Sequence, residues 1–373
     1  MAHNATWQLA QELLIHIIEF LGNSPADLRA CALVSRSFVH AAQSQIFQEI
    51  SLGSGAASVH GDRRPTRLLE TLHAAPHLAQ YVRRLRLQPS RISGSTLSEI
   101  CCFPLPRLKA VFCSYFDLSP VTVAALRHLL ALPTLLSVEI ACHVPQRLVF
   151  VELWSLCSPS IKHLDLKCDI QSAFGARDLP DRLTAPARLT SLCIGDTTGV
   201  RDWVNHPLCP FDFSAVAGLS VSIYVEVVHW PKIAPILQNI TVFAFTARPG
   251  MNGLDLSVFG SLENLRIRLS ENLRIGLSVG VAWRSARAAL LTIPPSNNIR
   301  KIVLSSKSFS AHDSDELART LTSLPLHHAG VLDFEMPPNY YNRAIASLPP
   351  TIRNDTRRTD DDPHWFERMT RDL

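Results

Sequence analysis

Two patterns of apolar residues divide the chain. Between Leu9 and Leu52 apolar residues recur at helical spacing, in three short runs separated by residues that start or stop helices. Beyond this segment the pattern apolar-x-x-apolar-x-apolar returns many times, and its last three positions alternate as in a β-strand. The chain is therefore predicted to be a helical N-terminal segment followed by repeated strands.

The predicted first helix carries more apolar surface than one packing partner needs. Leu13, Ile17 and Leu21 form one stripe at i, i+4 spacing, while Leu14 and Ile18 form another stripe about 100° away. Three short helices cannot bury both stripes among themselves. We therefore expect the excess apolar surface to meet the rest of the chain or another protein.

Polar residues predict where the next two helices begin. Ser24 offers a capping hydroxyl, Pro25 suits the first helical position, and Asp27 adds negative charge to the first turn. Ser35 can cap a third helix that continues to Ile46.

The strand pattern recurs at a regular interval. Counted on its middle apolar residue, successive copies lie 22 to 28 residues apart from Leu85 to Leu265, and later copies are spaced more widely. The copies are Val82/Leu85/Leu87, Leu108/Val111/Cys113, Leu135/Val138/Ile140, Ile161/Leu164/Leu166, Leu189/Leu192/Ile194, Val216/Leu219/Val221, Ile240/Phe243/Phe245, Leu262/Leu265/Ile267, Ile299/Ile302/Leu304 and a weaker copy near Leu332/Phe334.

Helical runs lie between several of these copies. Ser119 and Pro120 open one that stops at Pro133, and another lies between Pro145 and Pro159. A helix-and-strand unit of about 26 residues falls in the range of leucine-rich repeats, and such units stack because none can bury its apolar face alone. Regular leucine-rich repeats place an asparagine three residues after the last apolar position. Here that position is occupied by other residues in several copies, namely Phe116, His143, Asp169 and Thr197.

These patterns predict an α/β protein in four parts. Residues 1–52 form a three-helix module, and the Gly/Ser-rich residues 53–66 form a flexible linker. Residues 67–348 form an irregular leucine-rich-repeat solenoid of parallel strands alternating with helices. Residues 349–373 form a charged tail that has lost the pattern.

Composition narrows the possible functions. The hydrophobic content of 47% leaves ample material for a core, and the net charge of +4 is too small to predict nucleic-acid binding. No apolar run has the length of a membrane span, and no secretory signal is visible. The nine cysteines lack C-x-x-C spacing, which argues against a metal site and favours a reduced compartment. We expect no cofactor, no membrane contact, and a cytoplasmic or nuclear location.

One short motif points to catalysis. Gly276-Leu277-Ser278-Val279-Gly280 matches the G-x-S-x-G nucleophile motif of serine hydrolases. Asp313 or Asp315, followed by His327 or His328, would supply partners in the chain order of that class. The motif lies inside the repeat pattern and lacks the preceding oxyanion-type glycine run, so the chain is predicted not to be an enzyme, with a hydrolase using Ser278 as a remote alternative.

The N-terminal segment resembles the F-box family, in particular the F-box-like domains of mushroom-forming fungi. The family begins with a Leu-Pro-x-Glu-Leu signature and continues with Val-Ser-x-x-Trp. Here the corresponding residues are Leu9-Ala10-Gln11-Glu12-Leu13 and Val34-Ser35-Arg36-Ser37-Phe38, with Ala10 in place of the proline and Phe38 in place of the tryptophan.

The resemblance implies a substrate-recognition subunit of an SCF-like cullin–RING ubiquitin ligase. Such a subunit binds a Skp-type adaptor through its F-box and a protein target through its repeats, and it works by proximity rather than by chemistry of its own. The residues expected at the adaptor interface and in its supporting core are Leu9, Glu12, Leu13, Ile17, Leu28, Leu33, Val34 and Phe38. An alternative is a non-catalytic repeat scaffold whose N-terminal helices only cap the solenoid.

The protein target is expected to bind side chains that point outward from the strands. These side chains lie between the apolar positions of the pattern, because neighbouring residues of a strand face opposite sides. The candidates are Arg84, Arg86, His163, Asp165, Arg266 and Lys301.

Overall fold

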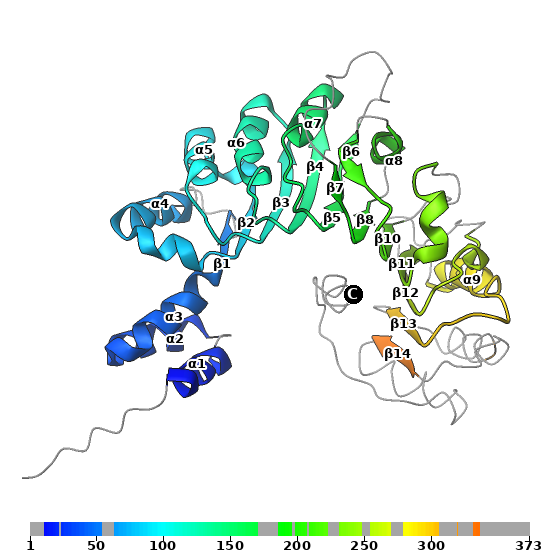
Figure 1. Cartoon of the computed structure of the whole chain (residues 1–373), viewed down its shortest axis with the longest axis horizontal. Coiled ribbons are helices and arrows are strands. Elements are labelled where there is room, and N and C mark those ends of the chain that lie inside the picture. Colours follow the sequence, from blue (N-terminus) through cyan, green and yellow to red (C-terminus); the bar gives the residue numbers. More distant parts are fainter. Residues whose placement is uncertain are drawn as a thin grey trace, which may run out of the picture. The chain divides into compact units, whose positions relative to one another are not determined.

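The computed structural model describes residues 11–21, 24–53, 63–170, 186–195, 198–206, 209–222, 231–247, 254–269, 279–305, 319 and 331–335. These residues form a mixed α/β structure in which mostly parallel strands alternate with helices (Figure 1). At this level the predicted fold class is confirmed. By its internal contacts the chain divides into two units, residues 1–160 and 161–373.

The first unit begins with helices and continues with a parallel sheet in the order β1-β2-β3-β4. Its α-helices are α1 (Gln11–Phe20), α2 (Pro25–Val34), α3 (Arg36–Gln48), α4 (Arg64–Ala74), α5 (Gly94–Cys102), α6 (Pro120–Leu130) and α7 (Arg147–Trp154). Its strands are β1 (Glu49–Leu52), β2 (Arg84–Leu87), β3 (Ala110–Asp117) and β4 (Ser137–Val144), and its 3-10 helices are η1 (Pro76–Tyr81) and η2 (Pro89–Arg91).

The second unit contains a parallel sheet in the order β5-β8-β10-β11-β12-β13-β14 and a separate β7-β9 pair. The strands of the sheet are β5 (His163–Leu166), β8 (Ser191–Ile194), β10 (Gly218–Ser222), β11 (Val242–Ala247), β12 (Asn264–Leu269), β13 (Lys301–Ser305) and β14 (Val331–Glu335). The short strands β6 (Asp169–Ile170), β7 (Ala187–Arg188) and β9 (Phe211–Asp212), the helices α8 (Thr198–Asn205) and α9 (Val279–Leu290), and the 3-10 helices η4 (Ala234–Asn239) and η5 (Leu256–Val258) complete it.

The repeated apolar pattern sets the register of both sheets. In the first sheet the middle residues Leu85, Val111 and Val138 lie directly beside one another on neighbouring strands. In the second sheet the same holds along the series Leu164, Leu192, Leu219, Phe243, Leu265, Ile302 and Leu332. In the nine full copies no side chain of the pattern is more than 3% exposed. The predicted strands and their buried positions are confirmed.

Backbone hydrogen bonds join each strand to the next in a repeated way. The carbonyl group two residues before the middle apolar residue accepts two N–H groups from the following repeat. Thus Arg83 accepts from Lys109 and Ala110, at 2.8 and 3.0 Å. The same arrangement recurs at the carbonyls of Lys109, Lys162, Thr190, Ala217, Thr241 and Glu263. This ladder of backbone hydrogen bonds joins neighbouring strands within each unit.

Helices α4 to α7 lie along one face of the first sheet (Figure 1). The predicted helix after Ser119 is α6, whose Thr122 N–H donates to Ser119 Oγ at 3.2 Å. An ion pair at 3.0 Å, between Arg127 Nη1 and Glu152 Oε1, ties α6 to α7. These helices cover the apolar pattern, so the side chains between its positions lie on the opposite side, which we call the open face.

The predicted N-terminal module is joined directly to the sheet. Its last four residues form β1, which pairs with β2 so that Ile50 lies beside Leu85. Gly53, the first residue of the predicted linker, has φ +84° and its carbonyl accepts a 3.2 Å hydrogen bond from Arg91. The helix α4 already begins at Arg64, inside the predicted linker of residues 53–66. The predicted tail, residues 349–373, lies outside the described residues.

Candidate functional site

The two apolar stripes of α1 have different surroundings. Leu14 and Ile18 are buried, and Ile18 belongs to a core cluster that α1 forms with α2 and α3. Leu13 and Ile17 are 52% and 43% exposed. Phe20, which lies on the same side of the helix as Leu13 at i+7 spacing, is 89% exposed. The stripe of Leu14 and Ile18 thus builds the core. Leu13 and Ile17 face solvent together with Phe20, whereas Leu21 packs against the core cluster.

The second helix adds exposed apolar residues at its C-terminal end. Leu33 and Val34 are both largely exposed, and α3 starts immediately after them with Ser37 N–H donating to Ser35 Oγ at 3.3 Å. Leu28, by contrast, is buried, and Phe38 packs against the same core cluster.

The predicted adaptor residues therefore separate into two groups. Leu13, Ile17, Leu33 and Val34 are exposed and can meet a partner. Leu28 and Phe38 lie inside and can only support the helices. Leu9 lies outside the described residues, and the side chain of Glu12 is not described although its backbone is helical.

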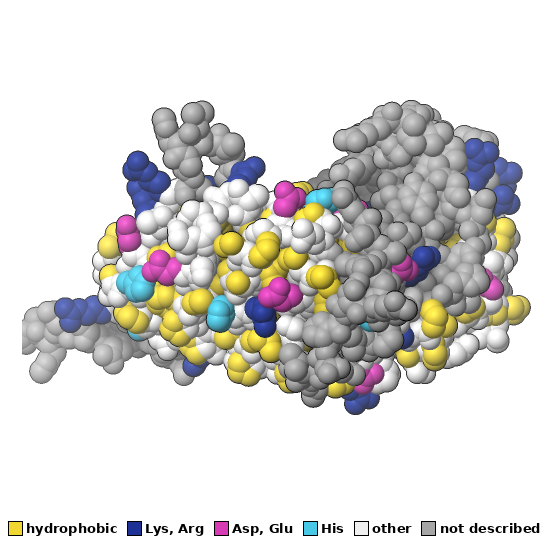
Figure 2. All heavy atoms as spheres, turned by 90° about the horizontal axis from the view of Figure 1, so that it is seen from above, with side chains coloured by type: hydrophobic (Ala, Val, Ile, Leu, Met, Phe, Trp, Pro, Cys, Tyr) yellow, Lys and Arg dark blue, Asp and Glu magenta, His cyan; other side chains and the backbone are white. Residues whose placement is uncertain are grey.

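Exposed apolar side chains are concentrated in these first helices. Six of the twelve large apolar side chains that are exposed in the described part of the chain belong to α1 and α2, namely Leu13, Ile15, Ile17, Phe20, Leu33 and Val34. The other six lie in different strands, helices and turns. Figure 2 shows hydrophobic side chains lying among charged, histidine and other side chains on one face of the described part. Scattered apolar residues are normal on a protein surface, whereas a concentration indicates an interaction site.

On the open face of the first sheet, Arg84 and Arg86 share one acidic partner. Arg86 Nε donates to Glu49 Oε1 at 2.6 Å, and Arg84 Nη1 lies 3.7 Å from Glu49 Oε2. The Arg86 guanidinium also lies 4.5 Å from the centre of the Phe112 ring. The sequence pattern placed both arginines on the correct face but missed Glu49, which belongs to an unpredicted strand.

On the open face of the second sheet, polar side chains bind one another both between strands and along one strand. His163 Nδ1 and Ser191 Oγ are 2.7 Å apart, and Lys167 Nζ lies 2.8 Å from Asp165 Oδ2. Burial raises the pKa of the Cys193 thiol, and the nearby Asp165 carboxylate raises it further. Cys193 therefore keeps its proton at neutral pH and is not a ready nucleophile.

The other two candidates of the second sheet, Arg266 and Lys301, differ from each other in exposure. Arg266 lies on the open face by register, between Ala244 and Val303, but only 7% of its surface is exposed. We expected Arg266 to face solvent, and this is wrong because the residue is buried. Lys301 lies beside Asn264 and is partly exposed.

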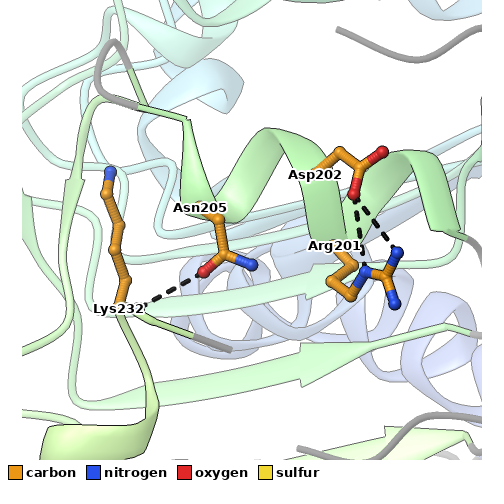
Figure 3. Close-up of polar contacts among 4 residues, drawn as sticks. All are labelled: Arg201, Asp202, Asn205 and Lys232. Carbon is orange, nitrogen blue, oxygen red and sulfur yellow. Dashed lines mark hydrogen bonds and ion pairs between the residues drawn. The ribbon is translucent and has the colours of Figure 1, made fainter. Parts of the chain in front are cut away.

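Polar contacts around α8 hold the end of that helix. Lys232 N–H donates to Asn205 Oδ1 at 3.3 Å, and Lys232 Nζ donates to the carbonyl oxygen of His206 at 2.5 Å. In the same region Arg201 Nε and Arg201 Nη2 each lie 3.4 Å from Asp202 Oδ1 (Figure 3). Burial, followed by the Lys232 charge, lowers the pKa of His206. A lysine at a helix C-terminus is stabilising, so this cluster is a structural one.

The hydrolase candidates all lie outside the described residues, namely Ser278, Asp313, Asp315, His327 and His328. Within the described ranges no three His, Cys, Asp or Glu side chains are grouped as for a metal ion. None of the helices in those ranges is both long and apolar enough to be a membrane span. No protein-family model matches the chain, and no curated protein matches its sequence.

Proposed function

We propose that this chain is an F-box-type substrate receptor of an SCF-like cullin–RING ubiquitin ligase. In this proposal α1, α2 and α3 bind a Skp-type adaptor, and an irregular leucine-rich-repeat solenoid holds the protein target. The chain itself performs no chemistry. It raises the effective concentration of the target near the ubiquitin-loaded enzyme.

The observation that carries the proposal is the exposed apolar stripe of α1. Leu13, Ile17 and Phe20 project from a helix whose neighbouring stripe already fills the core. Burying one large apolar side chain in an interface is worth about 1.5–3 kcal/mol, so three such residues can anchor a partner. Leu33 and Val34 add apolar surface in a segment that also carries the family's second motif.

A binding experiment with a purified Skp-type adaptor tests the proposal. The full chain should retain the adaptor, and the double variant Leu13→Asp with Ile17→Asp should lose it. A matched control is Leu148→Asp with Leu291→Asp, because these residues are 51% and 52% exposed but lie on other helices or turns. If the α1 variant retains as much adaptor as the control, the receptor proposal fails.

The rival proposal is a non-catalytic scaffold whose N-terminal helices cap the repeats. The junction between α3 and the sheet favours it, since β1 pairs with β2 and Tyr81 Oη lies 2.6 Å from His40 Nδ1. Under this proposal no adaptor binds, and the α1 double variant changes only solubility. The same experiment therefore separates the two.

A further inference from the structure

The residues that directly precede the strands of the first sheet form a row along one edge of that sheet. Arg83 N–H donates to the Gln48 carbonyl at 3.0 Å. Lys109 N–H donates to the Arg83 carbonyl and Leu136 N–H to the Lys109 carbonyl, each at 2.8 Å. These four residues, which we call the edge row, therefore hold equivalent positions before β1, β2, β3 and β4, with neighbours about 4.8 Å apart.

The centre of the edge row carries two positive charges side by side. Arg83 and Lys109 are both exposed, and Arg107 is an exposed residue of the loop that leads to Lys109. Within the described residues none of these three side chains forms an ion pair or a hydrogen bond. Like charges on neighbouring strands destabilise each other, so the fold itself gains nothing from this arrangement.

The equivalent positions of the second unit show how such charges can be balanced. There the Glu263 carbonyl accepts the Arg300 N–H at 2.8 Å, so these two residues are neighbours in the same sense as Arg83 and Lys109. Their side chains have opposite charges, and Arg300 Nη2 lies 3.7 Å from Glu263 Oε1. The edge row of the first unit lacks an acidic member that could form such a pair.

The acidic residues on the strands of the first sheet do not neutralise the edge row. Glu49 forms its 2.6 Å hydrogen bond with Arg86. Asp117 is the last residue of β3, at the end opposite to the edge row, and Glu139 lies three residues beyond Leu136. The positive charge of the edge row therefore remains available to a ligand from outside.

We propose that the edge row binds an acidic segment of another protein through a cluster of carboxylates on Arg83, Arg107 and Lys109. The basic part of the row is short, because Gln48 is uncharged and Leu136 is apolar and 36% exposed. A nucleic acid continues with one phosphate after another and would meet no further cation along the row, whereas a few adjacent carboxylates match it. The proposal goes beyond the proposed function, since it requires neither an adaptor nor a ubiquitin ligase.

Fluorescence anisotropy with defined peptides tests this site on the full-length protein. The probe is a labelled, end-blocked octapeptide in which four adjacent glutamates lie between two pairs of serines. The matched peptide carries glutamine in place of each glutamate. Wild type should bind the glutamate peptide about tenfold more tightly than the glutamine peptide, because only carboxylates form charge-assisted hydrogen bonds with these basic side chains. Added salt should weaken the binding, as expected for exposed charges.

Two variants and a control assign the binding to the edge row. Arg83→Gln with Lys109→Gln should weaken binding of the glutamate peptide about tenfold. Lys109→Glu should remove the preference for glutamate, because it places a carboxylate beside Arg83, and its urea midpoint should not fall below that of wild type. The control is Arg63→Gln with Arg67→Gln, which removes two exposed positive charges at the start of α4 and should bind as wild type does.

The outcomes distinguish this proposal from the proposed function. If wild type binds neither peptide or both equally, if the edge-row double variant binds as wild type does, or if the control loses as much affinity, the acidic-segment site is wrong. Tighter binding of a polyuridine oligonucleotide than of the glutamate peptide also contradicts it. Adaptor retention by the edge-row double variant is measured in parallel and should equal that of wild type. Loss of adaptor binding in wild type with normal peptide binding overturns only the receptor proposal.

Discussion

The open faces of the two sheets are built on the same strand pattern, but they use their polar groups differently. In the first sheet Arg84 has no short hydrogen bond among the described residues, and Tyr115 projects into solvent. In the second sheet His163 binds Ser191, and Asp165 binds Lys167 across short distances. A shared strand framework can therefore carry open faces whose polar side chains are held to different degrees.

The shared framework predicts equal costs for matched core substitutions. Leu85→Ala in the first sheet and Leu192→Ala in the second should each lower the free energy of unfolding by about 2–5 kcal/mol, because both leave a cavity in a buried position. Urea denaturation followed by circular dichroism measures the change. Leu148→Ala, at an exposed site, should change it by less than about 0.5 kcal/mol. A cost below about 1 kcal/mol in either sheet would contradict the common framework.

Substitutions on the two open faces should differ in how much they lower the free energy of unfolding. Ser191→Ala removes the hydroxyl that binds His163 and should cost about 1 kcal/mol. Arg84→Gln should change stability by less than about 0.5 kcal/mol, because its ion pair is long and partly exposed. Ser191→Thr keeps a hydroxyl and should restore most of the loss. If Ser191→Ala and Arg84→Gln lower the free energy of unfolding equally, the two open faces do not differ in how far their side chains stabilise the fold.

Acid should weaken the second unit through His206. Burial and the Lys232 charge lower its pKa in the folded protein, so the unfolded chain binds the proton more tightly. The contribution of His206 to the free energy of unfolding is therefore present above the pKa of about 6.5 in the unfolded chain. It is lost as the pH falls toward the pKa of His206 in the folded protein. Urea midpoints of wild type and His206→Gln should converge between pH about 7.5 and about 5. A difference that stays constant over this range would exclude the effect.

The smallest expected effect is a difference in the rates at which individual cysteine thiols are alkylated. Cys102 is exposed on α5, whereas burial raises the pKa of Cys113 in the first sheet and of Cys193 in the second. Iodoacetamide reacts with thiolates, so Cys102 should be modified well before the other two. Peptide mass mapping over time measures this order. If Cys193 reacts as fast as Cys102, the second open face is more accessible than its contacts indicate.

The repeated strands could be predicted because their signal is local. Each copy carries apolar residues at fixed offsets, and burial then follows from the side that they share. The strand β1 was missed for the same reason. Phe47, Ile50 and Leu52 have the spacing of the pattern, but they directly follow a helical run and were assigned to the helical module.

The candidate site could be predicted only in part. Leu13 and Ile17 were found because a second stripe was visible on the helix, but that stripe was continued to Leu21, which packs against the core, and not to the exposed Phe20. Which stripe is buried depends on contacts with α2 and α3, which no local pattern contains. Likewise, the pairing of Glu49 with Arg86 depends on strand register, and the local pattern places Arg266 on the outward side without indicating that it is buried.

The backbone ladder has a consequence for how the amino-acid sequence of such a chain can evolve. Its acceptors are main-chain carbonyls at positions occupied by residues as different as Arg83, Ala217 and Glu263. Every amino acid supplies a carbonyl, so mutations there leave the joint between neighbouring repeats intact. Outward side chains beside the ladder can then diversify without loss of the framework, which allows one architecture to acquire new binding preferences.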